Sequence, residues 1–466
     1  MTTTTTTPAS FKAEWFKLGA IVVTTFVVCW TLAIGYWHFT DRNPGIGELG
    51  LALFALPLGI LLAFWSGQKA IAARAASVPT SASKPAVSAP STTTAASTPV
   101  LAIVGTALRS PHGSSADDLA SAIADNEACA DLDQELVDDN GFPVMTARCD
   151  DAQDAMLQDE IVEWLSSQGM RPEFSEEQWR ALILATGVAA ELASQAAGEL
   201  MPVEGTPPRL QLRLLLPDDW AADSRHAMTT WLTHTVGQYG WPVADIAVPE
   251  GQEQPHMTPA KVLAQLMPTT SSANAPVIGL VIACASLIGQ ESIDRLAARS
   301  ALFTASQSRG QIPGEGAAGL LLTDLTLAQS CGADVALLGP FDERRRDSSA
   351  DEARQADSTL LMEMTTQISQ AAAVDLSQID MVVADTAHRP NRVLELMGLS
   401  TPAIPQVDAA DDIVRIGLGS GSCGAVPFLT VLALARHYAL ERQAPILCIG
   451  NEDPFVRCAA LVRPPA

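Results

Sequence analysis

A glycine-punctuated turn that leads straight into an apolar run is the feature that most restricts the fold of this chain. Gly314 and Gly316 permit backbone angles and close approaches that a side chain would prevent. Residues 317–322 are small and then branched apolar residues, a pattern typical of a strand buried on both faces. The segment therefore predicts a tight turn at the entrance to a core strand.

The sequence around this turn predicts an α/β protein. The chain has 466 residues, 48% of them hydrophobic, and can bury more than one ordinary core. From residue 100 onward, short apolar strands alternate with helical patterns, as in a mostly parallel sheet. Strands are expected at 100–105, 210–215, 277–283, 317–322, 334–338, 381–384, 413–416, 446–449 and 459–462. Helices are expected at 221–239, 258–267, 286–300, 352–373, 391–399 and 425–440. The acidic, helix-poor stretch 131–159 is expected to form an excursion from the core.

Two long apolar runs near the N-terminus predict a membrane anchor. Residues 18–37 contain no charge, and 49–67 form a second run of similar length, so together they predict a helical hairpin across a bilayer. Lysines precede the first run, and Lys69 and Arg74 follow the second, whereas the connection between the runs offers only Arg42. This bias predicts a bacterial inner-membrane protein with both ends in the cytoplasm. Residues 1–75 are thus the anchor, and the Ala/Ser/Thr/Pro-rich stretch 76–99 is a flexible tether.

Charge and cysteine usage exclude several classes of function. A formal net charge of −24 argues against nucleic acid as a partner. The basic run 344–346 lies beside three acidic residues and is interpreted as a solvated loop. The eight cysteines include no Cys-x-x-Cys pair and no histidine at zinc-ligand spacing, so neither a metal nor another cofactor is expected. Buried thiols in a reducing compartment explain this pattern.

Three segments give the chain a resemblance to a known group. They are residues 100–107 with Pro111 and Gly113, the Gly-Glu-Gly turn at 314–316, and the glycine-rich segment 417–425 with its following helix. In these segments the chain resembles the β-ketoacyl synthase group of the thiolase-like superfamily. The resemblance implies two βαβαβ halves, 100–328 and 329–466, stacked as five αβαβα layers. It also leaves a homodimer open, through the dimer contact that the family uses.

The same resemblance implies a degenerate catalytic site. Active members use a cysteine nucleophile, two histidines and a glycine-rich C-terminal loop. The helix that would carry the nucleophile begins near His256, where this chain has no cysteine, and Asp385 stands where the first histidine is expected. The second histidine is missing from the segment Gly417 to Gly424, and residues 450–454 replace the C-terminal glycine loop. No catalytic residue is therefore assigned, and the degenerate-site positions are His256, Asp385, His388, Gly417, Ser420 and Cys423.

Some of these positions keep alternative interpretations. Asp385 and His388 share a strand-to-helix turn, where catalytic groups often lie, but the Asp-x-x-His spacing favours a local cap or surface pair. Cys423 precedes a helix whose N-terminal dipole would lower its pKa, although no base is placed beside it. Cys284 follows an apolar strand and is interpreted as a core thiol rather than a displaced nucleophile. Ser420 is interpreted as part of a flexible turn.

The sequence favours a membrane-anchored, catalytically inactive scaffold or adaptor. It would bind an unidentified protein partner at the cytoplasmic face of the inner membrane, in a secretion or envelope-assembly system, and would contact lipid through its N-terminal hairpin. Two enzymatic alternatives stay open. One is a divergent acyltransferase or condensing enzyme, and the other is a chain-length-factor-like partner of a ketosynthase acting on acyl thioesters.

Overall fold

The computed structural model describes residues 100–201, 208–248, 257–267, 277–352, 355–400 and 403–465. The expected membrane hairpin, the tether and His256 lie outside these ranges. Within them, one helix, α6 (Glu176–Glu199), is long and apolar enough to cross a membrane. Because 61% of its apolar window is buried inside the fold, α6 is accounted for as a core helix.

One ten-stranded sheet forms the frame of the structure, and its strand order is β10-β9-β11-β12-β8-β1-β7-β6-β4-β5. The strands are β1 (Leu101–Arg109), β4 (Arg209–Leu215), β5 (Ile246–Ala247), β6 (Val277–Ser286), β7 (Glu315–Thr323), β8 (Ala336–Arg345), β9 (Met381–Ala384), β10 (Ile413–Arg415), β11 (Ile446–Gly450) and β12 (Val456–Arg463). The helices besides α6 are α4 (Ala116–Ala124), α5 (Ala155–Ser167), α7 (Ala222–Gly237), α8 (Pro259–Leu266), α9 (Gln290–Ala298), α10 (Leu325–Cys331), α11 (Thr359–Ala372), α12 (Pro390–Ser400), α13 (Gly417–Ser420) and α14 (Val426–Arg442).

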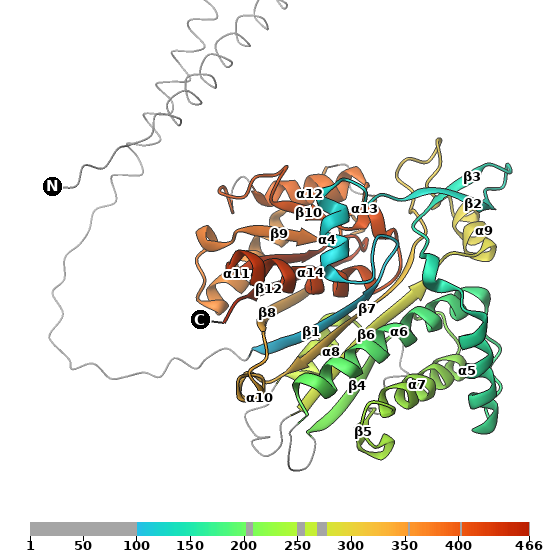
Figure 1. The fold of residues 1–466 in the computed structure, drawn as a ribbon. Coiled ribbons are helices and arrows are strands. Elements are labelled where there is room, and N and C mark those ends of the chain that lie inside the picture. Colours follow the sequence, from blue (N-terminus) through green and yellow to red (C-terminus); the bar gives the residue numbers. More distant parts are fainter. Residues whose placement is uncertain are drawn as a thin grey trace, which may run out of the picture. The chain divides into compact units, whose positions relative to one another are not determined.

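The sheet consists of two halves with the same topology. In the first half the order is β1-β7-β6-β4-β5, and in the second it is β8-β12-β11-β9-β10. In the first half, β6 runs parallel to β4 and antiparallel to β7. In the second half, β11 likewise runs parallel to β9 and antiparallel to β12. The first strands of the two halves, β1 and β8, pair antiparallel through Leu101–Ile103 and join the half-sheets. In Figure 1 the first half is coloured from blue through green to yellow, and the second half from orange to red.

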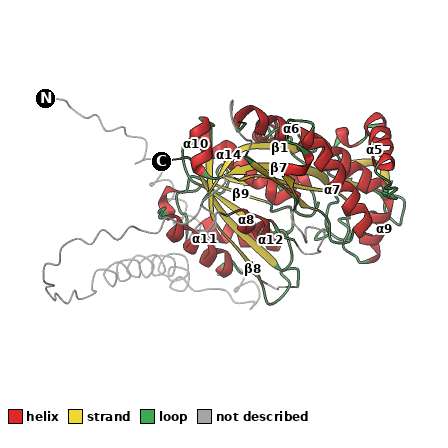
Figure 2. Cartoon of the chain, turned by 90° about the horizontal axis from the view of Figure 1, so that it is seen from below, coloured by secondary structure: helices red, strands yellow, loops and turns green. Residues whose placement is uncertain are grey.

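Three apolar clusters show how helices and half-sheets are layered. Alternate residues of one strand face opposite sides, as a pleated strand requires. In β9, Met381 and Val383 belong to the central cluster that contains α14, whereas Val382 and Ala384 belong to the outer cluster with α11 and α12. The other outer cluster packs α6 and α7 against the first half-sheet. The order is therefore helix, sheet, helix, sheet, helix, which is the expected five-layered α/β architecture (Figures 1 and 2).

Helix α14 occupies the central layer because it is apolar on nearly every side. Val426 through Ala435 are all buried, and a helix that is hydrophobic all round needs protein on every face. The much shorter α8 holds the equivalent place after β5 in the first half, and its Val262 and Leu263 join the same cluster. The central helix of the first half is thus reduced to eight residues.

The predicted strands and helices of the core are found, and β9 begins and ends as predicted. The helix expected at 352–373 begins only at Thr359, and the strand expected at 334–338 extends to Arg345. One expectation is wrong. The basic run is not a loop, because Arg344 and Arg345 lie in β8 and pair with Arg457 and Val456 of β12. Arg344 is neutralised on the strand itself, where its Nε lies 2.7 Å from Asp342 Oδ2. The acidic stretch forms the hairpin β2 (Asp131–Val137) and β3 (Pro143–Thr146), a two-stranded sheet separate from the main one, and then enters α5. This agrees with the expected excursion from the core.

The Gly-Glu-Gly turn brings two distant backbone segments together. Gly314 N donates to Ser422 O at 3.1 Å, and a Cβ on Gly314 would lie 2.1 Å from Ser420 O. Only glycine allows this approach. The turn therefore fixes the entrance of β7 against the segment that precedes α14.

Glu315, the middle residue of the turn, is a buried carboxylate with four donors. Arg180 of α6 donates from Nε at 2.7 Å and from Nη2 at 2.5 Å. Cys149 N donates at 2.8 Å and Ser286 Oγ at 2.9 Å. Because the exposed fractions of the Arg180 and Glu315 side chains are 3% and 0%, water cannot replace these bonds.

Substituting Glu315→Gln should destabilise the fold strongly, because it leaves the Arg180 charge buried without its counter-ion. In a fragment comprising the compact unit 95–466, we expect the free energy of unfolding to fall by about 3–5 kcal/mol. Urea denaturation followed by circular dichroism measures this loss.

The matched control for this prediction is Glu191→Gln. Glu191 pairs with Arg109 at 2.9 Å, but both side chains are partly exposed, so the cost should be about 0–1 kcal/mol. Equal losses in the two variants would contradict the role assigned to Glu315.

Candidate functional site

The candidate site lies where the ends of three strands of the second half meet. Strands β9, β10 and β11 are parallel, so their carboxyl ends lie at one edge of the half-sheet. Asp385 follows β9, Gly417 begins the short α13 after β10, and Asn451 follows β11. A Cβ on Gly417 would lie 2.3 Å from Asp385 O, so this glycine permits contact between the first two turns.

Asp385 is held by the backbone of the turn after β11. Its Oδ1 accepts hydrogen bonds from Asn451 N at 2.8 Å and from Glu452 N at 3.1 Å. Part of the Asp385 residue stays accessible, but its carboxylate is enclosed, and this burial raises its pKa to about 7. The two backbone donors oppose the rise, while the nearby Glu452 charge adds to it. Asp385 is therefore a carboxyl group that exchanges a proton near neutral pH.

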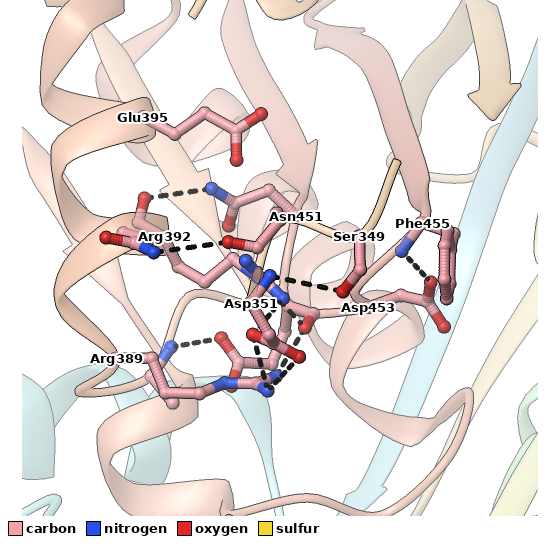
Figure 3. A network of polar contacts seen from close by, with 12 residues as sticks. Ser349, Asp351, Arg389, Arg392, Glu395, Asn451, Asp453 and Phe455 are labelled. Atoms are coloured by element: carbon pink, nitrogen blue, oxygen red, sulfur yellow. Dashed lines mark hydrogen bonds and ion pairs between the residues drawn. The ribbon is translucent and has the colours of Figure 1, made fainter. Parts of the chain in front are cut away.

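Two buried arginines at the start of α12 fasten the turns to one another (Figure 3). Arg389 Nε donates to Glu452 Oε1 at 2.8 Å, and its Nη2 donates to Glu452 O at 2.5 Å. Arg392 Nη2 donates to Asp351 Oδ1 at 2.7 Å, and its Nε donates to Glu452 O at 3.3 Å. Asn451 Nδ2 donates to Arg392 O at 3.0 Å and so joins the turn after β11 to α12. The exposed fractions of the two arginine side chains are 6% and 0%.

Another buried ion pair involves Glu395, which lies one turn after Arg392 on α12. Arg457 of β12 donates from Nε and Nη2 to the two carboxylate oxygens of Glu395 at 2.8 and 2.9 Å. Arg346 Nη1 adds a third bond to Glu395 at 2.9 Å. Arg457 and Glu395 are 0% and 1% exposed in their side chains. Paired guanidinium and carboxylate groups thus lie behind the strand ends, and within the described residues only Arg346 Nε and Arg392 Nη1 of this network are buried without a partner.

His388 lies at the same turn but is not paired with Asp385, so the interpretation of Asp385 and His388 as a cap or surface pair is wrong. Both ring nitrogens of His388 lack a hydrogen-bond partner within the described residues. The ring stands edge-on to Phe303, with 4.7 Å between centroids. Burial lowers the pKa of His388, so the imidazole is neutral at pH 7.

Ser420 and Cys423 belong to the turn between α13 and α14. Ser420 O lies against Gly314, and the Cys423 thiol lies 3.7 Å from the same oxygen. Cys423 is 1% exposed, and burial raises the pKa of its thiol. Burial and the nearby Glu315 charge thus shift the pKa in the direction opposite to the one expected from the helix N-terminus. Cys284 is a core thiol as expected, since burial raises its pKa to about 12.

His256, which precedes α8 in the sequence, lies outside the described residues, which resume at residue 257. Thr258 caps the helix by accepting from Lys261 N. The sequence has no cysteine between Cys149 and Cys284, so the segment that forms this helix carries none. Within the described residues no cluster of three metal-ligating side chains occurs.

Comparison with solved structures identifies the architecture. The ketosynthase from module 6 of the bacillaene synthase of Bacillus subtilis 168 matches with a TM-score of 0.54 at 12% identity, over 79% of this chain and 72% of that one. A β-ketoacyl synthase from Burkholderia phymatum STM815 matches with a TM-score of 0.53 at 11% identity, over 79% of this chain and 100% of that one. The chain has a thiolase-like fold of the ketosynthase type. No protein-family model and no curated protein matches the sequence.

A third ketosynthase-type structure is a type II polyketide synthase acyl-carrier protein in complex with its ketosynthase bound to the hexaketide. It matches with a TM-score of 0.54 at 13% identity, over 79% of this chain and 100% of that one. At identities this low, the matches show the ketosynthase-like fold alone. Any chemistry has to be inferred from the residues of this chain.

Sequence reasoning found the three turns but missed the arginine network that joins them. The signal present in the sequence is the pair Arg389 and Arg392, spaced so that both lie on one face of a helix start. Their acceptors Asp351 and Glu452 lie far away along the chain, so nothing local identifies them.

Asp385→Asn should change how stability depends on pH. Because the folded-state pKa is raised above its ordinary 3.8 to about 7, the folded chain holds a proton over this range that the unfolded chain has lost. The free energy of unfolding therefore falls as pH rises from about 4 to 7, by at most about 1.4 kcal/mol per pH unit. We expect Asp385→Asn to remove this component of the slope in urea denaturation at pH 5, 6, 7 and 8.

Asp375→Asn is the control for the pH experiment. The Ser377 side chain lowers the pKa of exposed Asp375, so this group is ionised in both states between pH 5 and 8 and the slope should not change. An unchanged slope in Asp385→Asn as well would show that Asp385 does not titrate in this range.

Proposed function

We propose that this chain is a non-catalytic, ketosynthase-like adaptor that binds a protein partner at the cytoplasmic face of a bacterial inner membrane, in a secretion or envelope-assembly system. The observation that carries the proposal is the filling of the ketosynthase-type site. Arg389 and Arg392 bind Glu452 and Asp351 at the strand ends where such a site would need open reactive groups.

The missing chemical groups support the same conclusion. Acyl transfer requires a nucleophile that can ionise and a base that can accept its proton. Cys448 lies inside β11 and Cys423 follows α13, yet burial raises the pKa of both thiols. Asp385 has a pKa of about 7, suited to proton exchange, but it accepts backbone bonds. Burial also raises the pKa of Cys458, the thiol on which the Asp385 charge acts. A ketosynthase-like fold that lacks the catalytic groups still offers surfaces that can bind a partner.

Membrane attachment is supported by the sequence. The apolar runs 18–37 and 49–67 are long enough to cross the hydrocarbon layer. The residues from 95 onward form a compact unit of their own, which suits a domain that works beside the membrane.

Affinity purification of the full chain from gently solubilised native membranes tests the proposal. We expect one partner in stoichiometric amount, which then rebinds the purified chain. Because the binding surface belongs to the compact unit, the fragment 95–466 should bind the purified partner with an affinity within about threefold of the full chain, and this is measured by biolayer interferometry.

The identity of the partner separates the alternatives. An active ketosynthase or an acyl carrier protein as the stoichiometric partner would replace the adaptor by a chain-length-factor-like or condensing role. Recovery of no protein above an untagged control would contradict the adaptor directly.

A further inference from the structure

A polar pocket of about 480 Å³ lies outside the degenerate site, at the base of the β2–β3 hairpin. Its walls come from the hairpin, from residues 146–150 that follow it and from the 111–112 turn. Arg180 of α6 and His112 also line it. In Figure 1 the hairpin projects from the first half beside α9.

Two side chains in this pocket keep polar atoms without partners. Arg180 is 2% exposed, and its Nε and Nη2 bind Glu315. Its Nη1 has no hydrogen-bond partner among the described residues. His112 Nε2 makes no hydrogen bond of normal geometry either, although the backbone at Gly419 and Cys129 lies close enough to act on the pKa of the ring. Burial lowers that pKa, so the ring is neutral. Leaving a buried donor unbound costs about 1–3 kcal/mol, so Arg180 Nη1 indicates a ligand that supplies an acceptor.

The charge around these donors is strongly negative. Glu315 already neutralises Arg180, and Arg148 is bound by Asp133 at 3.0 Å and by Glu135 at 3.3 Å. Asp131 and Asp150 also line the pocket, and both are exposed. Counting Glu315 with the lining, five carboxylates face two guanidinium groups. An anion would be repelled, whereas a cation at the rim would be attracted.

The rim also carries an apolar side chain. Leu132 lines the pocket and is 59% exposed. It lies in β2, whose Asp131 and Asp133 are its direct neighbours. The pocket thus combines acidic side chains, an exposed leucine and the unbound Nη1 of Arg180.

We infer that this pocket binds a basic peptide segment of a partner protein, with a peptide carbonyl oxygen on Arg180 Nη1 and a lysine or arginine side chain at Asp131 and Asp150. A peptide carbonyl is a neutral acceptor, which suits a guanidinium already neutralised by Glu315. An apolar residue of the segment packs on Leu132. The inference rests on the proposed adaptor function, and it names the surface and the chemistry of the partner.

A library of capped random octapeptides selected on the full, detergent-solubilised chain tests this site. We expect enriched peptides to contain lysine or arginine next to an apolar residue. In fluorescence anisotropy, Asp131→Asn/Asp150→Asn should weaken their binding at least about tenfold, because two carboxylates in direct contact with the cation of the peptide are each worth a severalfold change. Enrichment without basic residues would overturn the inference.

Two further variants locate the binding. Asp139→Asn/Asp159→Asn removes the same charge at exposed positions outside the pocket, and binding should stay within about twofold, as expected for surface charges. His112→Phe removes the unbound Nε2 and should weaken binding, provided that its thermal unfolding matches the original chain. Unchanged affinity in folded His112→Phe would show that the peptide does not enter the pocket.

Cysteine labelling supplies an independent measurement. Cys129 lines the pocket and is exposed, and Cys331 is exposed on α10, outside the pocket lining. The bound peptide should slow alkylation of Cys129 and leave Cys331 unchanged. Equal rates at Cys129 with and without peptide would contradict the placement.

The partner purification separates this inference from the proposed function. If Asp131→Asn/Asp150→Asn loses a partner that the original chain retains, both stand. If the variant retains the partner with unchanged affinity, the adaptor stands and the pocket inference fails. If neither chain retains a partner and no peptide is enriched, both fail.

Discussion

The buried pair of Glu315 and Arg180 is the interaction on which the arrangement of the domain depends. A single carboxylate at the entrance of β7 receives donors from α6, from the end of β6 and from the segment after the hairpin. Gly314 beside it carries the turn against the segment that precedes α14. Because the pair is desolvated, no water can take the place of a missing partner. The same pair also leaves Nη1 of Arg180, a residue that lines the acidic pocket, without a partner among the described residues.

A second set of buried ion pairs lies at the strand ends of the second half. Arg457 and Glu395 form a bidentate pair, and Arg389 fastens the turns after β9 and β11 to one another through Glu452. Each guanidinium is bound by several acceptors, so the region is rigid rather than open. A network built in this way holds the strand ends in place.

Local chemistry explains what could be predicted from the sequence. Strand β9 was predictable because a short apolar run ends at Asp385, and the turn at Gly314 was predictable because two glycines precede a core strand. The function of Glu315 was not, since its donors come from residues up to 166 positions away. The same holds for Glu395, which lies 62 positions from Arg457. Burial, which no local pattern measures, also reverses the expectation for Cys423 by raising its pKa.

The central claim is that the strand ends carry no acyl-transfer chemistry, and intact-mass measurement of the folded protein after incubation with acyl-CoA and malonyl-CoA tests it most directly. The account predicts no covalent acyl adduct and no decarboxylation of malonyl-CoA above background, because the thiols of Cys423 and Cys284 are buried with raised pKa values. A stable adduct that disappears in Cys423→Ala or Cys284→Ala, while the variant stays folded, would contradict the account and establish a divergent enzyme.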